Sequence, residues 1–181
     1  MKINWKKINI RDLAAVISNT LRKNGVEVIL VGGACVSIYA KNKYISYDLD
    51  FITDSSFKKF APVLNELGFK KKDGRLFEHP QCNFLIDFPP PPIAIGNEPV
   101  FKLKSLETKY GMIRLLTPVD CVKYRLAAYF FWNDQQALEQ AVSVAKENRV
   151  NLPKIRKWAK KEDEMEKFKI FQKKLVKKGQ V

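Results

Sequence analysis

The sequence predicts an α/β (α+β) protein, with a small mixed sheet and flanking helices followed by a helical C-terminal part. Up to about residue 116, short runs of β-branched and apolar residues alternate with amphipathic segments. From Thr117 onward the apolar residues keep a helical period only. We therefore expect residues 1–116 to form an α/β core and residues 117–181 a helical region that ends in a basic tail.

The first half of the chain carries start and stop signals for its elements. Asn9 is a good N-cap for a helix that Gly25 ends. Asp73-Gly74 is a strong hairpin turn signal, and the run PPPPIAIGNEP should be an irregular loop because proline disrupts both ladders and helices. The expected strands are Val26–Val31, Tyr47–Thr53, Asn83–Phe88 and Lys109–Leu116, with a short helix at Ala34–Ala40 and another capped by Ser55 or Ser56.

The pattern of the sequence from Thr117 onward predicts helices. Thr117-Pro118-Val119-Asp120 combines an N-cap, a proline at the first helical position and a capping-box acid. The expected helices run over Val119–Trp132, over Asp134–Glu147 and from Pro153 onward. Phe130, Phe131 and Trp132 are expected in the core, although one of them could stack on a base. The apolar stripe of the last helix, best explained as packing surface, comprises Ile155, Trp158, Met165, Phe168, Phe171 and Leu175.

The charge is strongly positive. The chain has 33 Lys and Arg against 19 Asp and Glu, a net charge of +14. Residues 146–181 alone contain 13 basic and five acidic residues. Such a field attracts polyanions, so a nucleic-acid partner is expected, although a solvated lysine-rich surface explains the same composition.

Other function classes find little support. Three scattered cysteines without a C-x-x-C pair fit buried thiols in a reducing cytoplasm. No apolar run is long enough to span a bilayer, and the N-terminus lacks a signal-peptide core. His79, the only histidine, precedes a proline near the hairpin, so a loop or surface role is expected. Without it no Ser-His-Asp or Cys-His system can be built.

The most informative pattern is ILVGGACVSIYAKNKYISYDLDFI. An apolar strand enters Gly32-Gly33, and the next strand carries Asp48 and Asp50 on one face, because side chains two apart on a strand point the same way. A later apolar strand carries Asp87. Carboxylates crowded in this way need neutralisation, and a pair of divalent cations supplies it in phosphoryl transfer. Backbone amides at a glycine turn and helix start suit phosphates.

This order of motifs resembles the DNA polymerase β-like nucleotidyltransferase superfamily, and it looks most like the small bacterial nucleotidyltransferases of the AbiEii toxin group. The matching segments are VGGACVSIYA, SYDLDFIT, FLIDF and TPVDCVKYRLAAYFFWNDQQALEQA. The resemblance implies a nucleotidyltransferase fold. It also implies a cytoplasmic enzyme that uses Mg²⁺ or Mn²⁺ and an NTP substrate.

The resemblance assigns roles by position. Asp48, Asp50 and Asp87 would be catalytic metal ligands, and Asp87 would also help to deprotonate the acceptor hydroxyl. The remaining positions would bind the nucleotide: Gly32 and Gly33 the triphosphate, Ser46 through its hydroxyl, and Arg125, with Lys123 as its neighbour, through phosphate contacts.

The leading hypothesis is transfer of a nucleoside monophosphate from an NTP to a hydroxyl, with RNA such as tRNA favoured by the charge. A toxin role, with an antitoxin protein as partner, follows from the resemblance only. The alternatives are a catalytically inactive module of the same fold that binds RNA or a protein, a transferase for a small molecule of the antibiotic type, and an interaction protein that docks through its last helix.

Overall fold

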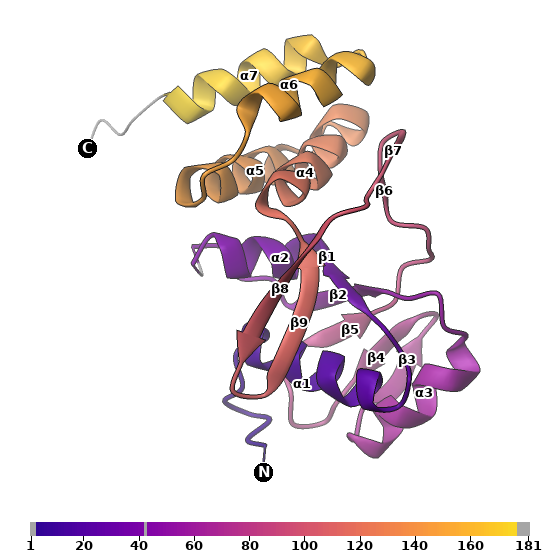
Figure 1. The fold of residues 1–181 in the computed structure, drawn as a ribbon. Coiled ribbons are helices and arrows are strands. Elements are labelled where there is room, and N and C mark those ends of the chain that lie inside the picture. The colour runs from indigo at the N-terminus through magenta and orange to yellow at the C-terminus, as the bar shows by residue number, and fades with distance from the viewer. Residues whose placement is uncertain (1–2, 42, 177–181) are drawn as a thin grey trace.

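The structure is a computed structural model that describes residues 3–41 and 43–176 (Figure 1). Lys177 and Lys178 of the predicted basic tail lie outside these residues. The helices are α1 (Ile10–Lys23), α2 (Gly32–Tyr39), α3 (Phe57–Glu66), α4 (Pro118–Trp132), α5 (Gln135–Glu147), α6 (Leu152–Lys161) and α7 (Met165–Val176). The strands are β1 (Ile29–Val31), β2 (Asp48–Ile52), β3 (Lys70–Asp73), β4 (Leu76–Glu78), β5 (Leu85–Asp87), β6 (Ala94–Ile95), β7 (Glu98–Pro99), β8 (Leu103–Thr108) and β9 (Gly111–Leu116).

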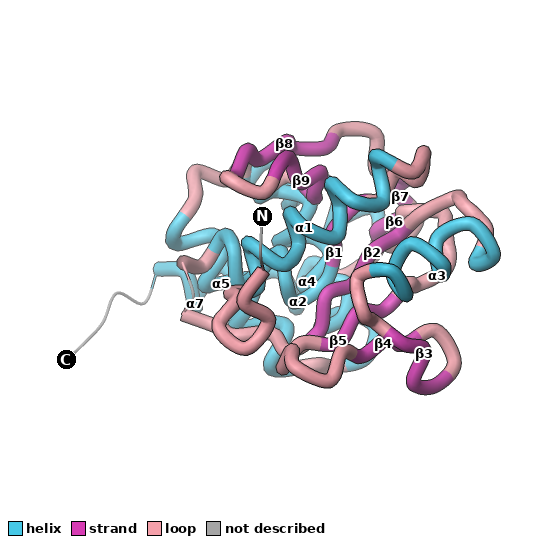
Figure 2. Tube along the Cα trace, turned by 90° about the horizontal axis from the view of Figure 1, so that it is seen from below, coloured by secondary structure: helices cyan, strands magenta, loops and turns pink. Residues whose placement is uncertain are grey.

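Seven strands form one mixed sheet in the order β3-β4-β5-β2-β1-β9-β8, which can be followed across the molecule in Figure 2. The pairs β1–β9 and β2–β5 are parallel, and the other neighbours are antiparallel. Helices flank the sheet, and α4 to α7 stack beyond it as a helical C-terminal part (Figure 1). The predicted fold class is therefore confirmed.

Capping chemistry sets the helix starts as expected. The Asn9 side chain accepts a hydrogen bond from the Asp12 amide at 2.8 Å, and Thr117 does the same for the Asp120 amide at 3.1 Å. Gly25, at φ +70°, follows the end of α1. Each cap satisfies an amide that has no partner inside the helix.

Three elements differ from the prediction. Strand β8 was missed because it is a half-exposed edge strand whose polar residues resemble a loop. The proline-rich run, expected to be irregular, contains the small β6–β7 hairpin. The last helix is two helices, because α6 ends at Lys161 with Glu162 as its C-cap, and Asp163 then takes a left-handed conformation at φ +60°.

Strand parity separates an apolar face of the sheet from a polar one. Phe51 and Phe88 point to the face that α3 covers, where the Phe60 ring stacks on Phe88 at 4.3 Å between centroids. Phe77 joins this aromatic cluster. Asp48 and Asp50 alternate with Leu49 and Phe51, so they point to the opposite face. Asp48 and Asp50 therefore point away from the aromatic part of the core that α3 covers.

The helical part buries its own apolar stripe. Trp158 and Phe130 stack at 5.3 Å between centroids, and Phe168 and Phe171 are fully buried. The expectation for the FFW run was only partly right, because Phe130 is 2% exposed while Phe131 is 45% and Trp132 77% exposed. Among the described residues, the structure contains no helix with the length and apolar character needed to cross a membrane.

Candidate active site

The three predicted acids lie on adjacent strands. In the parallel β2–β5 ladder Asp50 is directly opposite Asp87, and Asp48, two residues before Asp50, is opposite Leu85. Because residues in register share a face, all three carboxylates belong to the same side of the sheet. Val31, the last residue of β1, pairs with Asp50, which brings the acid to the start of the glycine turn.

The glycine turn is shaped around the neighbouring polar side chains. A Cβ atom on Gly32, which has φ +65°, would lie 1.7 Å from Asp50 Oδ2. A Cβ on Gly33 would lie 2.6 Å from Ser46 Oγ. Any side chain at either position would therefore displace Asp50 or Ser46, and Gly32 also needs a backbone conformation that glycine favours.

Helix α2 begins at this turn, and its first turn receives no side-chain cap. Ser46 is buried, and its hydroxyl donates to the Asp48 carbonyl at 3.0 Å while its amide donates to Ser37 Oγ at 2.9 Å. The amide-rich start of α2 thus lies beside the carboxylates, with positive dipole character toward them.

The electrostatics of Asp50 are those of a crowded acid. Burial, followed by the nearby charge of Asp87, raises the pKa of Asp50 from 3.8 to about 6. Arg125 and the Gly33 amide act in the opposite direction and favour the charged form, whereas Asp48 adds to the repulsion. Asp50 therefore sits where a positive charge would stabilise it.

Asp87 already has one cationic neighbour, Arg75, which the sequence did not single out. Arg75 Nε lies 2.7 Å from Asp87 Oδ1 and donates a hydrogen bond to Oδ2 at 3.0 Å. Oδ1 itself is buried and accepts no hydrogen bond of good geometry. Arg75 follows Asp73-Gly74 at the β3–β4 turn, so its only sequence signal was a basic residue beside a predicted hairpin.

The fit of a divalent cation follows from these groups. Asp87 Oδ1 is a buried acceptor without a hydrogen bond, and Asp50 is destabilised by like charge. Hard carboxylate oxygens are the ligands that Mg²⁺ and Mn²⁺ prefer. Within residues 3–41 and 43–176, however, no three His, Cys, Asp or Glu side chains stand close enough together to form a ready metal cage. The donor chemistry therefore suits the ion, and Asp48, Asp50 and Asp87 are the residues that would hold it.

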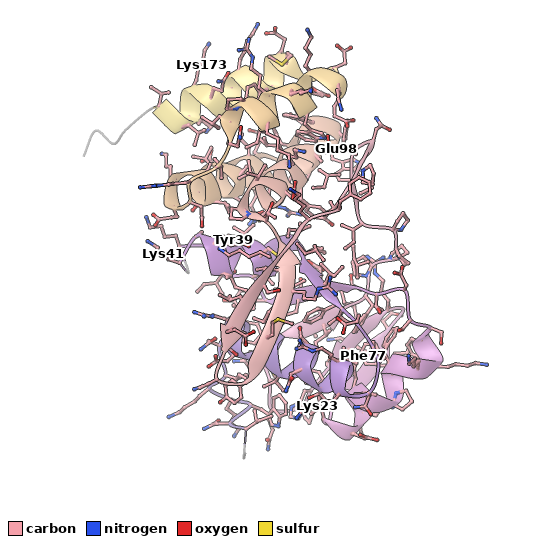
Figure 3. The ribbon with its side chains drawn as sticks, viewed as in Figure 1. Lys23, Tyr39, Lys41, Phe77, Glu98 and Lys173 are labelled. Carbon is pink, nitrogen blue, oxygen red and sulfur yellow. The ribbon has the colours of Figure 1, made fainter. Side chains whose placement is uncertain are left out.

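The two basic residues proposed for the nucleotide have different surroundings. The charge of Arg125 lowers the pKa of Asp50, and its guanidinium donates a hydrogen bond to Gln140 Oε1 at 3.2 Å. Its Nε is buried and has no hydrogen-bond partner in the described part of the chain. Lys123 is 1% exposed and donates to Glu98 Oε1 at 2.5 Å. Glu98 belongs to the β6–β7 hairpin and lies beside the helical end of the molecule (Figure 3). The structure therefore places Arg125 near the acids and engages Lys123 in a structural ion pair.

His79 lies in a loop as expected, but it is buried rather than at the surface. Its ring lies 4.7 Å from that of Trp5 and 5.1 Å from that of Phe69. Burial lowers its pKa. These contacts make it a packing residue of the α/β part.

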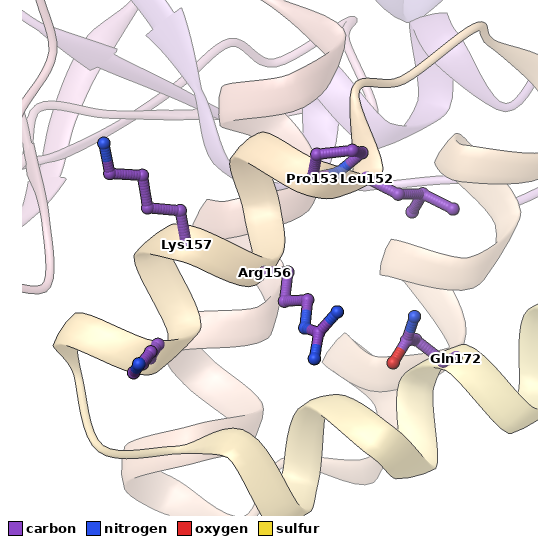
Figure 4. Close-up of a pocket in the computed structure, with 6 residues that line it drawn as sticks. Leu152, Pro153, Arg156, Lys157 and Gln172 are labelled. Carbon is purple, nitrogen blue, oxygen red and sulfur yellow. The ribbon is translucent and has the colours of Figure 1, made fainter.

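A separate cavity of about 450 Å³ lies between α6 and α7 (Figure 4). Its lining contains Arg156, Lys157 and Lys160 but none of the predicted site residues. It forms a basic surface on the helical part, separate from the carboxylates.

Comparison with known proteins identifies the fold. The chain is similar to the crystal structure of an antigenic nucleotidyltransferase-like protein from Paracoccidioides brasiliensis, with a TM-score of 0.59 and 9% identity over 77% of this chain and 76% of that one. It is also similar to the solution structure of the antibiotic-resistance factor ANT(2'')-Ia, with a TM-score of 0.52 and 12% identity over 88% and 90% of the two chains. No protein-family model and no curated protein sequence gives a significant match. The chain thus has a nucleotidyltransferase-like fold.

Proposed function

We propose that this protein is a metal-dependent nucleotidyltransferase that moves a nucleoside monophosphate from an NTP to a hydroxyl acceptor. The observation that carries the proposal is the pairing of Asp50 with Asp87 beside a glycine turn that admits no side chain. Two Mg²⁺ or Mn²⁺ ions bound there would neutralise the phosphates and stabilise the charge that develops in the transfer. Asp48, Asp50 and Asp87 would hold them.

The protein groups have distinct tasks in this proposal. The amides at the start of α2 and the Ser46 hydroxyl would bind the triphosphate, and Arg125 would bind a phosphate oxygen. Asp87 would accept the proton of the acceptor hydroxyl. The acceptor oxygen then bonds to the α-phosphorus, and the bond from that phosphorus to the bridging oxygen breaks with release of pyrophosphate.

RNA is the acceptor that the charge favours. The chain carries +14, and the basic cavity between α6 and α7 offers Arg156, Lys157 and Lys160 (Figure 4). Neutralising phosphates releases counterions, so RNA affinity should fall linearly on a log–log salt plot. Replacing these three residues by Glu should make the slope of log affinity against log salt concentration shallower. An unchanged slope would mean that the three residues are only solvent-exposed and do not contact RNA.

A role as a cytoplasmic toxin of a toxin–antitoxin pair belongs to the same proposal and rests on the resemblance to AbiEii-type nucleotidyltransferases. Such a toxin would need intact carboxylates to arrest growth and a protein antitoxin to relieve the arrest. Expression of the parent protein and of the Asp48→Asn variant under one inducible promoter tests it, because only the parent should slow growth.

A small molecule is the second candidate acceptor. The fold similarity to an antibiotic-resistance factor favours it. A basic chain is a poor host for a polycationic acceptor, so an uncharged or anionic small molecule would be expected.

The decisive experiment is an intact-mass screen. The protein is incubated with each NTP, Mg²⁺ and a panel of RNAs, proteins and small molecules, and the acceptor is weighed for a nucleotide increment. A gain on one acceptor class identifies the substrate. If no acceptor gains mass and Mg²⁺ with NTP fails to stabilise the protein in a thermal melt, the catalytic proposal fails and the inactive binding module replaces it.

A further inference from the structure

A groove runs along one face of α4. Its walls are α4 and the hairpin residues Ala94 to Gly96, and its volume is about 390 Å³. Arg125, Ala128 and Trp132 lie along it at intervals of three and four residues, the spacing of one helix face. From Arg125 to Trp132 the helix advances about 10 Å, the length of a few stacked bases. We call this feature the α4 groove.

The outer end of the α4 groove carries exposed aromatic rings. Phe131 is 45% and Trp132 77% exposed, although Phe130 beside them is buried. Both rings line the groove. Large aromatic side chains left in water next to a hollow indicate a binding surface, and aromatic rings are the platforms on which unpaired bases stack.

The inner end of the α4 groove is cationic. Arg125 lines it, and the charge of Arg125 favours the ionised form of Asp50, so this end of the groove is the one nearer to the proposed catalytic acids. Lys154 and Lys161 lie near enough to Glu98 on the hairpin to lower its pKa, behind the larger contribution of Lys123. Neither makes an ion pair with a carboxylate in the described ranges. Arg125 and these two lysines supply positive charge on the hairpin side of the groove, where the Glu98 and Glu162 carboxylates are already paired with Lys123 and Asn97.

The hairpin wall is held in place from behind. Trp158 Nε1 donates to the Ile95 carbonyl at 3.1 Å, and Glu162 accepts from the Asn97 amide at 2.9 Å. A Cβ on Gly96 would lie 2.6 Å from the Glu162 carboxylate, so this contact requires glycine. With the Lys123–Glu98 ion pair, these contacts fix the wall before any ligand binds, which lowers the ordering cost of binding.

We propose that the α4 groove binds the single-stranded end of a nucleic-acid acceptor, with unpaired bases stacked on Phe131 and Trp132 and the terminal hydroxyl directed toward Arg125 and Asp50. This inference rests on the proposed function and names its acceptor class. A protein partner would use the apolar rings but would not need Arg125 at the other end of the groove, and a small molecule would not need a groove of this length.

Tryptophan fluorescence gives a direct test. Trp158 is buried and Trp5 is partly buried, so Trp132 is the residue that a bound base should quench. The full-length protein is titrated with a six-nucleotide oligoadenylate, and affinity is measured separately by anisotropy of the labelled oligonucleotide. The parent should be quenched. The Trp132→Leu variant should lose the quench and bind roughly tenfold more weakly, while Trp132→Phe should keep most of the affinity.

Two controls make the result specific. Trp5→Phe should leave the quench in place, and Phe101→Leu, which removes an aromatic ring that is 87% exposed but does not line the groove, should leave the affinity unchanged. Equal affinity of Trp132→Leu and the parent, or equal losses in Trp132→Leu and Phe101→Leu, would overturn the proposal. Thermal melts with Mg²⁺ and NTP separate the two claims: stabilisation without oligonucleotide binding rejects the groove alone, and binding without stabilisation rejects the transferase alone.

Discussion

The carboxylates of strands β2 and β5 differ from the helical C-terminal part in how their charge is compensated. On these interior strands, Asp50 lies opposite Asp87, and the pKa of Asp50 rises to about 6 because burial and the neighbouring acid oppose ionisation. In the helical part, the most deeply buried cation, Lys123, has its own carboxylate partner in Glu98 at 2.5 Å.

On the proposed function, this difference separates residues that belong to the fold from residues that bind a ligand. A buried ion pair adds little net stability, but removing one partner destabilises the fold because the other charge loses its compensation. A crowded set of like charges costs stability until a ligand neutralises it. If the two regions differ in this way, substitutions in each should have opposite effects on stability and on ligand binding.

The largest effect is expected at Asp50. The Asp50→Asn variant should lower the rate of nucleotide transfer by roughly a hundredfold to a thousandfold, the loss that follows removal of one preorganised electrostatic contact. The Asn side chain keeps the shape that Gly32 accommodates but not the charge. Single-turnover assays with the acceptor found by the mass screen measure it, and Asp54→Asn, at an exposed acid just beyond β2, serves as the matched control. Full activity of Asp50→Asn would remove this acid from the catalytic set.

The second prediction contrasts Lys123 with Arg125. Lys123→Met should reduce the free energy of unfolding by about 1–3 kcal/mol, because Glu98 loses its buried partner. It should leave the affinity for Mg²⁺ and NTP unchanged. Arg125→Met should change the free energy of unfolding little. Its affinity for Mg²⁺ and NTP should be roughly tenfold to a hundredfold weaker, because a charge-assisted contact to phosphate is lost. Denaturation and nucleotide titration of both variants measure the two quantities.

If Lys123→Met loses nucleotide affinity while it remains folded, then Lys123 has the phosphate-binding role that the sequence suggested and the Glu98 pair is secondary. If both variants lose stability equally, the contrast between the two regions is wrong at these positions.

The position of the acids could be predicted because strand periodicity is local. Asp48 and Asp50 share a face by their spacing alone, and the apolar residues around Asp87 indicated a second strand. The caps at Asn9 and Thr117 were equally local, since each hydrogen bond spans three residues. Short-range patterns therefore predicted the strands that carry the acids, the two caps and the fold class, but not β6, β7 or β8.

The contacts that the sequence could not supply are those between distant segments. Arg75 meets Asp87 only because β4 pairs with β5, and Lys123 meets Glu98 only because a hairpin folds back onto α4. The exposure of Phe131 and Trp132 depends on where α4 ends, at Asn133 in a left-handed conformation. None of these follows from residue spacing, so the roles of the basic and aromatic residues needed the structure.

The third prediction concerns stability and pH without metal. The folded pKa of Asp50 is raised, so its contribution to stability is fully present below pH 3.8 and is lost as the pH rises through about 6. Two pKa units correspond to about 3 kcal/mol at most, and partial exposure reduces this to about 1–2 kcal/mol. Asp50→Asn should therefore be more stable than the parent by that amount at pH 8 and equal to it at pH 4. Urea denaturation in EDTA measures both, and a gap that does not change with pH would refute the assignment.

The smallest effect is expected at Arg75, which lies beside the carboxylates and compensates the charge of Asp87. Its side chain is 56% exposed, so the ion pair with Asp87 should contribute less than about 1 kcal/mol. Arg75→Gln should lose that much stability without metal, because Asp87 is then left beside Asp50 alone. Mg²⁺ with NTP should stabilise the variant at least as much as the parent, since the cation no longer competes with a guanidinium for Asp87. Lys72→Gln, which breaks the Lys72–Glu78 pair on the same hairpin, is the matched control and should leave the response to Mg²⁺ and NTP unchanged. If Arg75→Gln folds but is no longer stabilised by Mg²⁺ and NTP, then Arg75 binds the nucleotide rather than compensating the charge of Asp87 when no metal is bound.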